Sequence, residues 1–216
     1  MPVITIAQQK GGAGKTTLVA QLAAALASTG ARVALLDIDP QKSLSAWHAR
    51  RKDRIVAAAA GHDLGIDLEE SAGWKLGAAL DRLQKSHDWV LVDSPPHAET
   101  EARQAVRAAD LVLVPLQPSP LDLWATQPTL DLAAAEKRIA RLVLNRLPPR
   151  GKLLDSIRAE IAKGTTPALE AALGNRSAFA HSMGAGLGVT EYEPRGQAAE
   201  ETRALAAEIS RLLGRR

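Results

Sequence analysis

The sequence predicts an α/β protein with a doubly wound, mainly parallel sheet of about seven strands and helices on both faces. Short apolar runs alternate with longer stretches of helical periodicity, and several of these runs are apolar at every position. Parallel strands that are buried on both faces have such runs, and their alternation with helices is typical of βαβ units. With 216 residues and 46% hydrophobic content, we expect a single domain over residues 1–216.

The expected elements follow one another along the chain. Strands are predicted at residues 3–8, 32–38, 55–60, 89–94, 110–116 and 139–145, with a weaker one at 167–173. Helical periodicity predicts helices over about residues 16–28, 42–53, 74–86, 99–108, 122–136, 152–163 and 197–213. Residues 174–196 contain five glycines, which favours a loop region or turns around a short helix near Phe179.

The composition excludes several kinds of site. The chain has no cysteine, which rules out disulfides, thiolate metal sites and a cysteine-ligated iron–sulfur cluster. The five histidines lack the spacing of metal ligands, so we expect them at the surface or in turns. No signal peptide and no run of about 18 apolar residues is evident, so we expect a cytoplasmic protein.

The first apolar run leads into the segment QQKGGAGKTT at residues 8–17. Its end fits the phosphate-binding pattern G-x-x-x-x-G-K-[ST], although Gln9 takes the place of the first glycine. Glycines let backbone N–H groups approach phosphate oxygens, and the start of the following helix favours an anion. Lys15 would then reach the β- and γ-phosphates, and the Thr16 hydroxyl would bind Mg²⁺. The predicted nucleotide-binding residues are Gly11, Gly12, Ala13, Gly14, Lys15, Thr16 and Thr17.

Carboxylates follow two further strands. The second strand ends in DIDPQ at residues 37–41, and the run WVLVD ends at Asp93. Asp93 has the place of a Mg²⁺ ligand that acts through water, and Asp39 is placed to orient an attacking or magnesium-bound water. In an alternative interpretation, Asp37 and Asp39 only end a strand and cap the next helix.

These segments, in this order, resemble the deviant Walker A ATPases of the ParA/MinD family over nearly the whole chain. The resemblance rests on KGGAGKTT at residues 10–17, on residues 37–41, on Asp93 with the following SPP, and on YEPR at residues 192–195. It implies ATP and Mg²⁺ as cofactors and a homodimer on ATP binding. In that dimer Lys10 reaches the partner's nucleotide, where a cation would stabilise charge on the transferred phosphoryl group.

The resemblance also implies roles for other residues. Asp39 is the hydrolysis residue, and Asn145 with Arg146 lies near the nucleotide base, where an amide can both donate and accept. Basic residues around the last helix bind DNA non-specifically in this family. The DNA-contact candidates are therefore Arg176, Arg195, Arg215 and Arg216. Residues 137–163 have eight basic and two acidic side chains, which form either a solvated surface or a further face for nucleic acid.

Short ParA proteins lack an N-terminal repressor domain, and this chain resembles them. We therefore expect a slow ATPase associated with the nucleoid, whose hydrolysis a ParB-like or cargo-adaptor protein stimulates. Its cargo would be a plasmid, a chromosome or a protein cluster.

Two alternatives stay open at this point. A MinD-like membrane-associated regulator would use the apolar stripe of the last helix, which includes Leu205 and Ile209. We expect that stripe to pack on the core, because the helix also carries Glu200, Glu201 and Glu208 and lacks a strongly basic face. A metabolic P-loop synthetase or kinase would need an acceptor site, which the sequence does not reveal.

Overall fold

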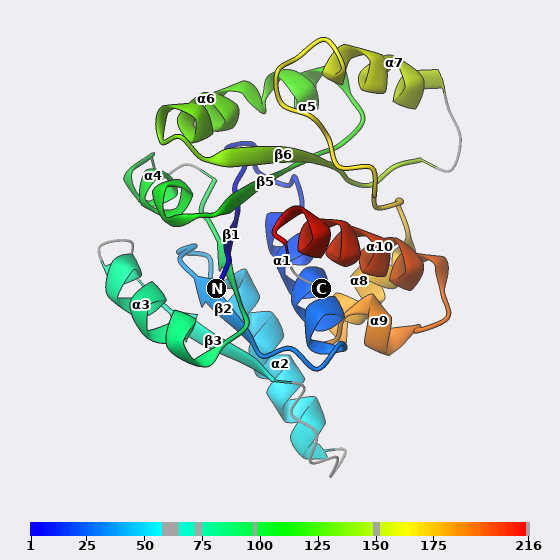
Figure 1. The fold of residues 1–216 in the computed structure, drawn as a ribbon. Coiled ribbons are helices and arrows are strands. Elements are labelled where there is room, and N and C mark those ends of the chain that lie inside the picture. The colour runs from blue at the N-terminus through cyan, green and yellow to red at the C-terminus, as the bar shows by residue number, and fades with distance from the viewer. Residues whose placement is uncertain (58–64, 72–74, 97–98, 149–151, 215–216) are drawn as a thin grey trace.

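The computed structural model describes residues 1–57, 65–71, 75–96, 99–148 and 152–214. In these residues six strands form one parallel sheet with the order β3-β2-β4-β1-β5-β6 (Figure 1). The strands are β1 (Val3–Ile6), β2 (Val33–Asp37), β3 (Ile66–Glu70), β4 (Trp89–Asp93), β5 (Leu111–Leu116) and β6 (Ile139–Leu144).

Helices connect these strands and follow the last of them. They are α1 (Lys15–Ala27), α2 (Ser43–Ala57), α3 (Leu76–Ser86), α4 (Glu99–Ala108), α5 (Pro120–Trp124), α6 (Gln127–Ala135), α7 (Lys152–Ile161), α8 (Ser177–Gly184), α9 (Val189–Tyr192) and α10 (Gln197–Leu212). The expected helix over residues 122–136 is divided into α5 and α6, and Pro128 stands in the first turn of α6.

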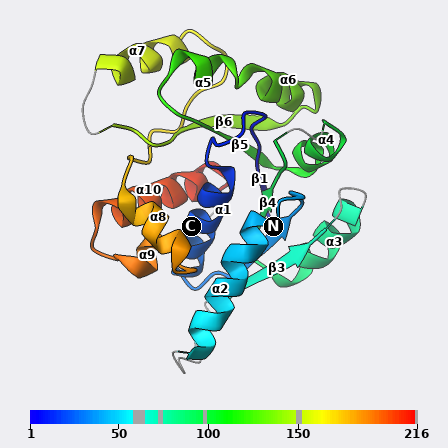
Figure 2. The same ribbon diagram turned by 180° about the vertical axis from the view of Figure 1, so that it is seen from behind.

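Helices cover both faces of the sheet, as Figures 1 and 2 show from opposite sides. On one face α1, α2 and α10 pack on alternate strand residues such as Ile4, Leu35 and Leu91. On the other face α3 and α4 pack on the intervening residues, and α6 and α7 cover β5 and β6. Because strands such as β2 and β5 are covered on both faces, they are buried along their whole length. The predicted fold class is confirmed, with six strands in place of about seven.

Two of the predicted strands, at residues 55–60 and 167–173, do not form in the described residues. Residues 55–57 belong to α2, so the predicted strand at 55–60 is wrong there; residues 58–60 lie outside the described residues. The third strand is instead β3 at the sheet edge, in whose sequence IDLEE only Ile66 is buried and the other side chains are partly or fully exposed. Residues 167–173 form no strand. They make one isolated bridge, between Ala168 and Leu142.

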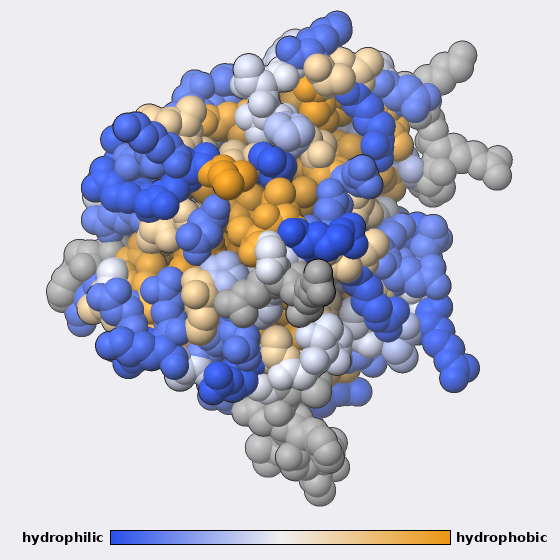
Figure 3. All heavy atoms as spheres, in the orientation of Figure 1, coloured by the Kyte–Doolittle hydropathy of each residue, from blue (hydrophilic) through white to orange (hydrophobic). Residues whose placement is uncertain are grey.

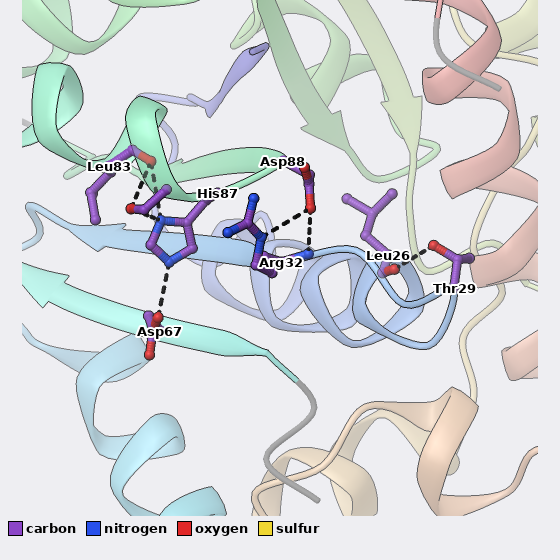
Figure 4. A network of polar contacts seen from close by, with 8 residues as sticks. Leu26, Thr29, Arg32, Asp67, Leu83, His87 and Asp88 are labelled. Atoms are coloured by element: carbon purple, nitrogen blue, oxygen red, sulfur yellow. Dashed lines mark hydrogen bonds and ion pairs between the residues drawn. The ribbon is translucent and has the colours of Figure 1, made fainter.

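Polar contacts align three strands at the amino-terminal edge of the sheet (Figure 4). The backbone N–H of Arg32 donates to Asp88 Oδ2 at 2.9 Å, and His87 Nε2 lies 2.9 Å from Asp67 Oδ2. Arg32 precedes β2, Asp88 precedes β4 and Asp67 lies in β3. His48 is buried within α2, so the expectation that histidines lie at the surface or in turns is wrong for it; His87 is also buried, but it lies in the connection between α3 and β4.

Polar residues cover much of the face seen in Figure 1, while apolar residues show in its middle (Figure 3). Leu205 and Ile209 of α10 are buried in the core with α1, and Leu213 packs partly against it, so the apolar stripe predicted for the last helix, which also includes Leu212, packs on the core except at Leu212, which is 38% exposed. Among the described residues, none of the helices has the length and apolar character needed to span a bilayer.

A buried ion pair joins α2 to α9. Arg51 is 2% exposed and donates to both carboxylate oxygens of Glu191, at 2.8 and 2.7 Å. Glu191 also accepts a hydrogen bond from the backbone N–H of Gly188. The Arg51 guanidinium carbon lies 5.7 Å from the centre of the Trp47 ring. Bidentate pairing of this kind is directional, so it fixes α9 against the helix that follows residues 37–41.

Replacing Arg51 with Leu should lower the free energy of unfolding by about 3–5 kcal/mol, because it leaves a largely buried carboxylate unpaired. The matched change Arg54→Leu, on an exposed position of the same helix, should alter it by less than about 0.5 kcal/mol. Urea unfolding followed by circular dichroism measures both. Equal effects of the two substitutions would show that the ion pair does not stabilise the fold.

Candidate functional site

The loop between β1 and α1 presents backbone N–H groups at a helix start. Gly12 and Gly14 have φ angles of 77° and 92°, in the left-handed region that favours glycine. Gly14 is the N-cap of α1, and no side chain caps this end of the helix. Uncapped N–H groups and the positive end of the helix dipole attract an anion. The loop therefore has the geometry that a phosphate group requires.

Lys15, Thr16 and Asp93 meet directly beneath this loop. The Thr16 hydroxyl donates to Asp93 Oδ2 at 2.7 Å, and Asp93 is fully buried at the end of β4. Burial raises the pKa of Asp93 to about 7, and the nearby Asp37 and Asp39 add to the rise, while the Thr16 hydrogen bond and Lys15 oppose it. Burial lowers the pKa of Lys15, although Asp93 and Asp39 oppose that change. Burial of the charged forms of Asp93 and Lys15 is thus unfavourable while no ligand is bound.

The oxygen atoms of this cluster fit a divalent cation. Asp93 Oδ1 is buried and has no hydrogen-bond partner, and the Thr16 hydroxyl lies beside the same carboxylate. Mg²⁺ prefers such hard oxygen ligands and commonly takes most of its remaining ligands from phosphates and water. In the described residues no cluster of three or more His, Cys, Asp or Glu side chains could hold a metal. A metal here would therefore depend on the oxygens of a bound phosphate.

The two aspartates of residues 37–41 have different surroundings. Asp37 is fully buried; its Oδ2 accepts from the backbone N–H and the hydroxyl of Ser45, and its Oδ1 accepts from the N–H of Asp39. The helix-capping interpretation thus holds for Asp37. Asp39 is 8% exposed and lines a cavity of about 370 Å³ together with Lys15 and Thr16. The structure brings Asp39 to the phosphate loop, where its expected role is possible.

A second cavity, of about 350 Å³, adjoins the loop beside Gly14. Asn145 lines it, but its Nδ2 donates to the Ala13 carbonyl and its Oδ1 accepts from the N–H of Arg146. A Cβ on Gly14 would lie 2.5 Å from Asn145 Nδ2, so the loop needs glycine there. The Nδ2 of Asn145 therefore holds the loop, while its Oδ1 accepts from the neighbouring residue Arg146. Base contact by Asn145 and Arg146 stays a prediction.

The sequence did not reveal most of the wall of this cavity. Its apolar part comes from Leu173, Phe179 and Met183. They lie in or next to the glycine-containing segment 174–196, which has no motif that would mark a binding surface. Their apolar character, with Asn145 at the rim, suits a planar heterocycle.

Lys10 lies outside the buried cluster of Lys15, Thr16 and Asp93, and it forms an ion pair with Asp122. Its Nζ lies 2.8 Å from Asp122 Oδ2, and its side chain is 40% exposed. Asp122 is buried in the first turn of α5, where Ser119 caps the helix. Burial opposes ionisation of Asp122, but hydrogen bonds from Lys10 and Ser119 hold its pKa below the ordinary value. Sequence reasoning missed Asp122; the segment QPSPLD at residues 117–122 was the available signal.

The DNA-contact candidates fall into three groups. Arg176 lines the 350 Å³ cavity, donates to Glu201 with Nη2 2.6 Å from Oε1, and has a side chain that is 31% exposed, so DNA contact by it stays a prediction. Arg195 is exposed between α9 and α10. Arg215 and Arg216 lie outside the described residues.

Comparisons with known proteins agree with this geometry. Residues 4–208 match the CobQ/CobB/MinD/ParA nucleotide binding domain. The chain is 30% identical over 204 residues to "Maintenance of carboxysome distribution protein A" of Halothiobacillus neapolitanus, covering 92% of this chain and 91% of that protein. It is 31% identical over 192 residues to "Protein ParA" of Rhizobium radiobacter, covering 83% of this chain and 81% of the other.

A solved structure confirms the fold independently. The septum site-determining protein MinD of Pyrococcus horikoshii, complexed with Mg-ADP, superimposes with a TM-score of 0.79 at 20% identity, over 99% of this chain and 97% of that one. The family match over residues 4–208 includes the loop at residues 10–17, the segment at residues 37–41 and Asp93. The chain therefore belongs to the CobQ/CobB/MinD/ParA nucleotide-binding family.

Proposed function

We propose that this protein is a ParA-like positioning ATPase that works as a dimerisation switch. The observation that carries the proposal is the different placement of two lysines on one loop. Lys15 is buried beside Asp93, whereas the side chain of Lys10 is 40% exposed and paired with Asp122. Because Lys10 does not belong to the buried phosphate site of its own subunit, it is available to the phosphate site of another subunit.

Each residue then has a role in binding or hydrolysis. Backbone N–H groups of residues 11–17 hold the ATP phosphates, and Lys15 neutralises their charge. Thr16, Asp93 and Asp39 would hold Mg²⁺, which would balance the charge of the β- and γ-phosphates. Asp39 orients the attacking water, and Lys10 of the partner subunit stabilises charge on the transferred phosphoryl group. Neither subunit has a complete site alone.

The proposed cycle of ATP binding and hydrolysis links dimerisation to the position of a cargo in the cell. The ATP-bound dimer binds DNA non-specifically, and a ParB-like or cargo-adaptor protein stimulates hydrolysis and separates the subunits. The relatives named for carboxysome distribution and for ParA support a positioning role, with a protein cluster, a plasmid or a chromosome as cargo. Because Leu205 and Ile209 of α10 are buried, they are not available to a MinD-like membrane anchor, and we propose association with the nucleoid instead.

Two substitutions test the switch. Lys10→Ala should keep ATP binding but lose ATP-dependent dimerisation and partner-stimulated hydrolysis, because the partner's site lacks its cation. Asp39→Ala should also bind ATP, yet stay dimeric because hydrolysis no longer separates the subunits. Size-exclusion chromatography with light scattering and a phosphate-release assay measure these outcomes. A dimeric, fully stimulated Lys10→Ala protein would contradict the crossing role of Lys10.

The pKa of Asp93 predicts a pH-dependent stability in the nucleotide-free protein. Its pKa rises on folding from 3.8 to about 7, so folding favours the protonated form, and the stability present at low pH is lost as the pH rises from about 4 to about 7. Asp93→Asn should therefore be more stable than wild type at pH 8, by up to about 4 kcal/mol, and similar to it near pH 4. Urea unfolding at several pH values measures this.

Asp155→Asn provides the matched control, because Asp155 is exposed. It should leave the pH profile of the free energy of unfolding unchanged. A profile for Asp93→Asn that runs parallel to that of wild type from pH 4 to pH 8 would show that the Asp93 carboxyl is not the group responsible.

The exposed Arg195 is the described candidate best placed for DNA. Arg195→Ala should weaken binding of the ATP-bound dimer to DNA of any sequence and lower the slope of log affinity against log salt by about one. Arg103→Ala, which removes an exposed arginine from α4 that pairs with Glu136, serves as the control. Fluorescence anisotropy with labelled duplexes measures both. An unchanged salt slope for Arg195→Ala would remove that residue from the DNA-binding surface.

A further inference from the structure

We propose that Glu201 of α10 is a positioning residue for the nucleotide base, because it holds residues 173–176 as one wall of the 350 Å³ cavity beside the phosphate loop. The inference rests on the proposed ATP binding and deepens it by naming the residue that shapes the pocket for the base. Glu201 does not itself line the cavity, so it acts through Gly174 and Arg176.

The wall is a connection between β6 and α8 that belongs to no strand or helix. Residues 173–176 all line the cavity. The backbone N–H groups of Leu173 and Asn175 donate to the carbonyls of Leu144 and Leu147, at 2.9 and 2.7 Å. The N–H group between these two takes no part in the bonds to β6 and its extension. The sheet therefore fixes only one side of the wall.

Glu201 fixes the other side of the wall. Its Oε2 accepts from the backbone N–H of Gly174 and from Arg176 Nε, both at 3.0 Å, and its Oε1 accepts from Arg176 Nη2 at 2.6 Å. The Glu201 side chain is only 19% exposed, so water competes weakly for these bonds. Bidentate bonds between a carboxylate and a guanidinium are directional and stronger than neutral hydrogen bonds. One carboxylate thus holds both a backbone group and a side chain of the wall.

The two groups that Glu201 holds are packed on each other. A Cβ on Gly174 would lie 2.9 Å from Arg176 Nε and 3.1 Å from Arg176 Cζ, so the guanidinium lies against the backbone of Gly174. Loss of the Glu201 carboxylate frees this guanidinium beside the cavity and leaves the N–H of the buried Gly174 without its acceptor. The shape of the wall therefore depends on Glu201.

The position of the wall identifies the part of the nucleotide that it contacts. The cavity adjoins Gly14 at the start of α1, and its apolar lining includes Leu173 and Phe179. Lys15 and Asp39 line the other cavity, of about 370 Å³, where the phosphates would bind. The base is the flat and largely apolar part of ATP, and apolar walls with a few polar groups suit such a ring. Glu201 should thus act on binding of the base and not on binding of the phosphates.

A second glutamate of α10 provides a matched control. Glu208 follows Glu201 by seven positions, which places both on the same side of the helix. The two carboxylate oxygens of Glu208 accept from the backbone N–H groups of Glu170 and Ala171, at 2.9 and 2.8 Å. Neither of these residues lines the cavity. Glu208 therefore holds an earlier part of the same connection to α10 without shaping the pocket.

The test compares binding of a non-hydrolysable ATP analogue with binding of inorganic tripolyphosphate, which has the phosphates but no base. Glu201→Ala should raise the dissociation constant of the analogue by about tenfold, because a buried N–H and a guanidinium of the wall lose their acceptor. It should leave the dissociation constant of tripolyphosphate within about twofold of wild type. Glu208→Ala should change neither constant. Isothermal titration calorimetry with Mg²⁺ measures all of these.

Two further variants keep the test decisive if Glu201→Ala does not fold. Glu201→Gln retains an acceptor oxygen for Gly174 but not the charge that holds Arg176, so it should weaken binding of the analogue less than Glu201→Ala does. Gly174→Ala removes no hydrogen-bonding group, but its Cβ would displace the Arg176 guanidinium. It should also weaken binding of the analogue and leave binding of tripolyphosphate unchanged.

The outcomes separate this inference from the proposed function. A wild-type protein that binds neither ligand would overturn both. A wild-type protein that binds the analogue, together with a Glu201→Ala protein that binds it equally well, would overturn only the positioning role. Equal losses for the analogue and tripolyphosphate, or equal losses in Glu201→Ala and Glu208→Ala, would show a general structural role of α10 and would also overturn it.

Discussion

Three carboxylates and one ammonium group are buried together at the carboxyl edge of the sheet, and the rest of the site depends on how their charge is balanced. Asp37 is satisfied by the N–H groups of Asp39 and Ser45 and by the Ser45 hydroxyl. Asp93 Oδ2 accepts a hydrogen bond from the Thr16 hydroxyl, and Asp93 Oδ1 has no hydrogen-bond partner among the described residues. Burial of an incompletely paired carboxylate is unfavourable, as its raised pKa shows. The protein thus keeps one buried anion ready for a cation.

The register of the sheet creates this cluster. β4 lies between β1 and β2, and Asp93 is paired in register with Ile6 on one side and with Asp37 on the other. All three strands run in the same direction, so the phosphate loop and both carboxylate segments leave the sheet at one edge. Ligands of doubly wound sheets bind at this edge, where the strand order reverses. The topology of the sheet therefore brings the phosphate loop and the two carboxylate segments together.

The sequence was sufficient for those parts of the molecule in which local pattern and environment agree. The buried strand β4 is apolar at every position before its terminal Asp93, and residues 10–17 have the spacing of a phosphate-binding loop. The edge strand β3 was missed because IDLEE is half polar, and the run containing Ile55 and Val56 fits a helix as well as a strand. Tertiary contacts decided the rest. Nothing local indicates that Asn145 holds the loop, that Arg176 pairs with Glu201, or that Asp122 pairs with Lys10.

The central claim is that one subunit has an incomplete site and that a second copy completes it. The most direct measurement is the initial rate of ATP hydrolysis per subunit as a function of protein concentration, at saturating ATP and Mg²⁺ and without any partner protein. If Lys10 acts across the dimer, the rate per subunit should rise with concentration and level off where light scattering shows twice the 22.9 kDa chain mass. A rate per subunit that is constant from fully monomeric to fully dimeric protein would contradict the account.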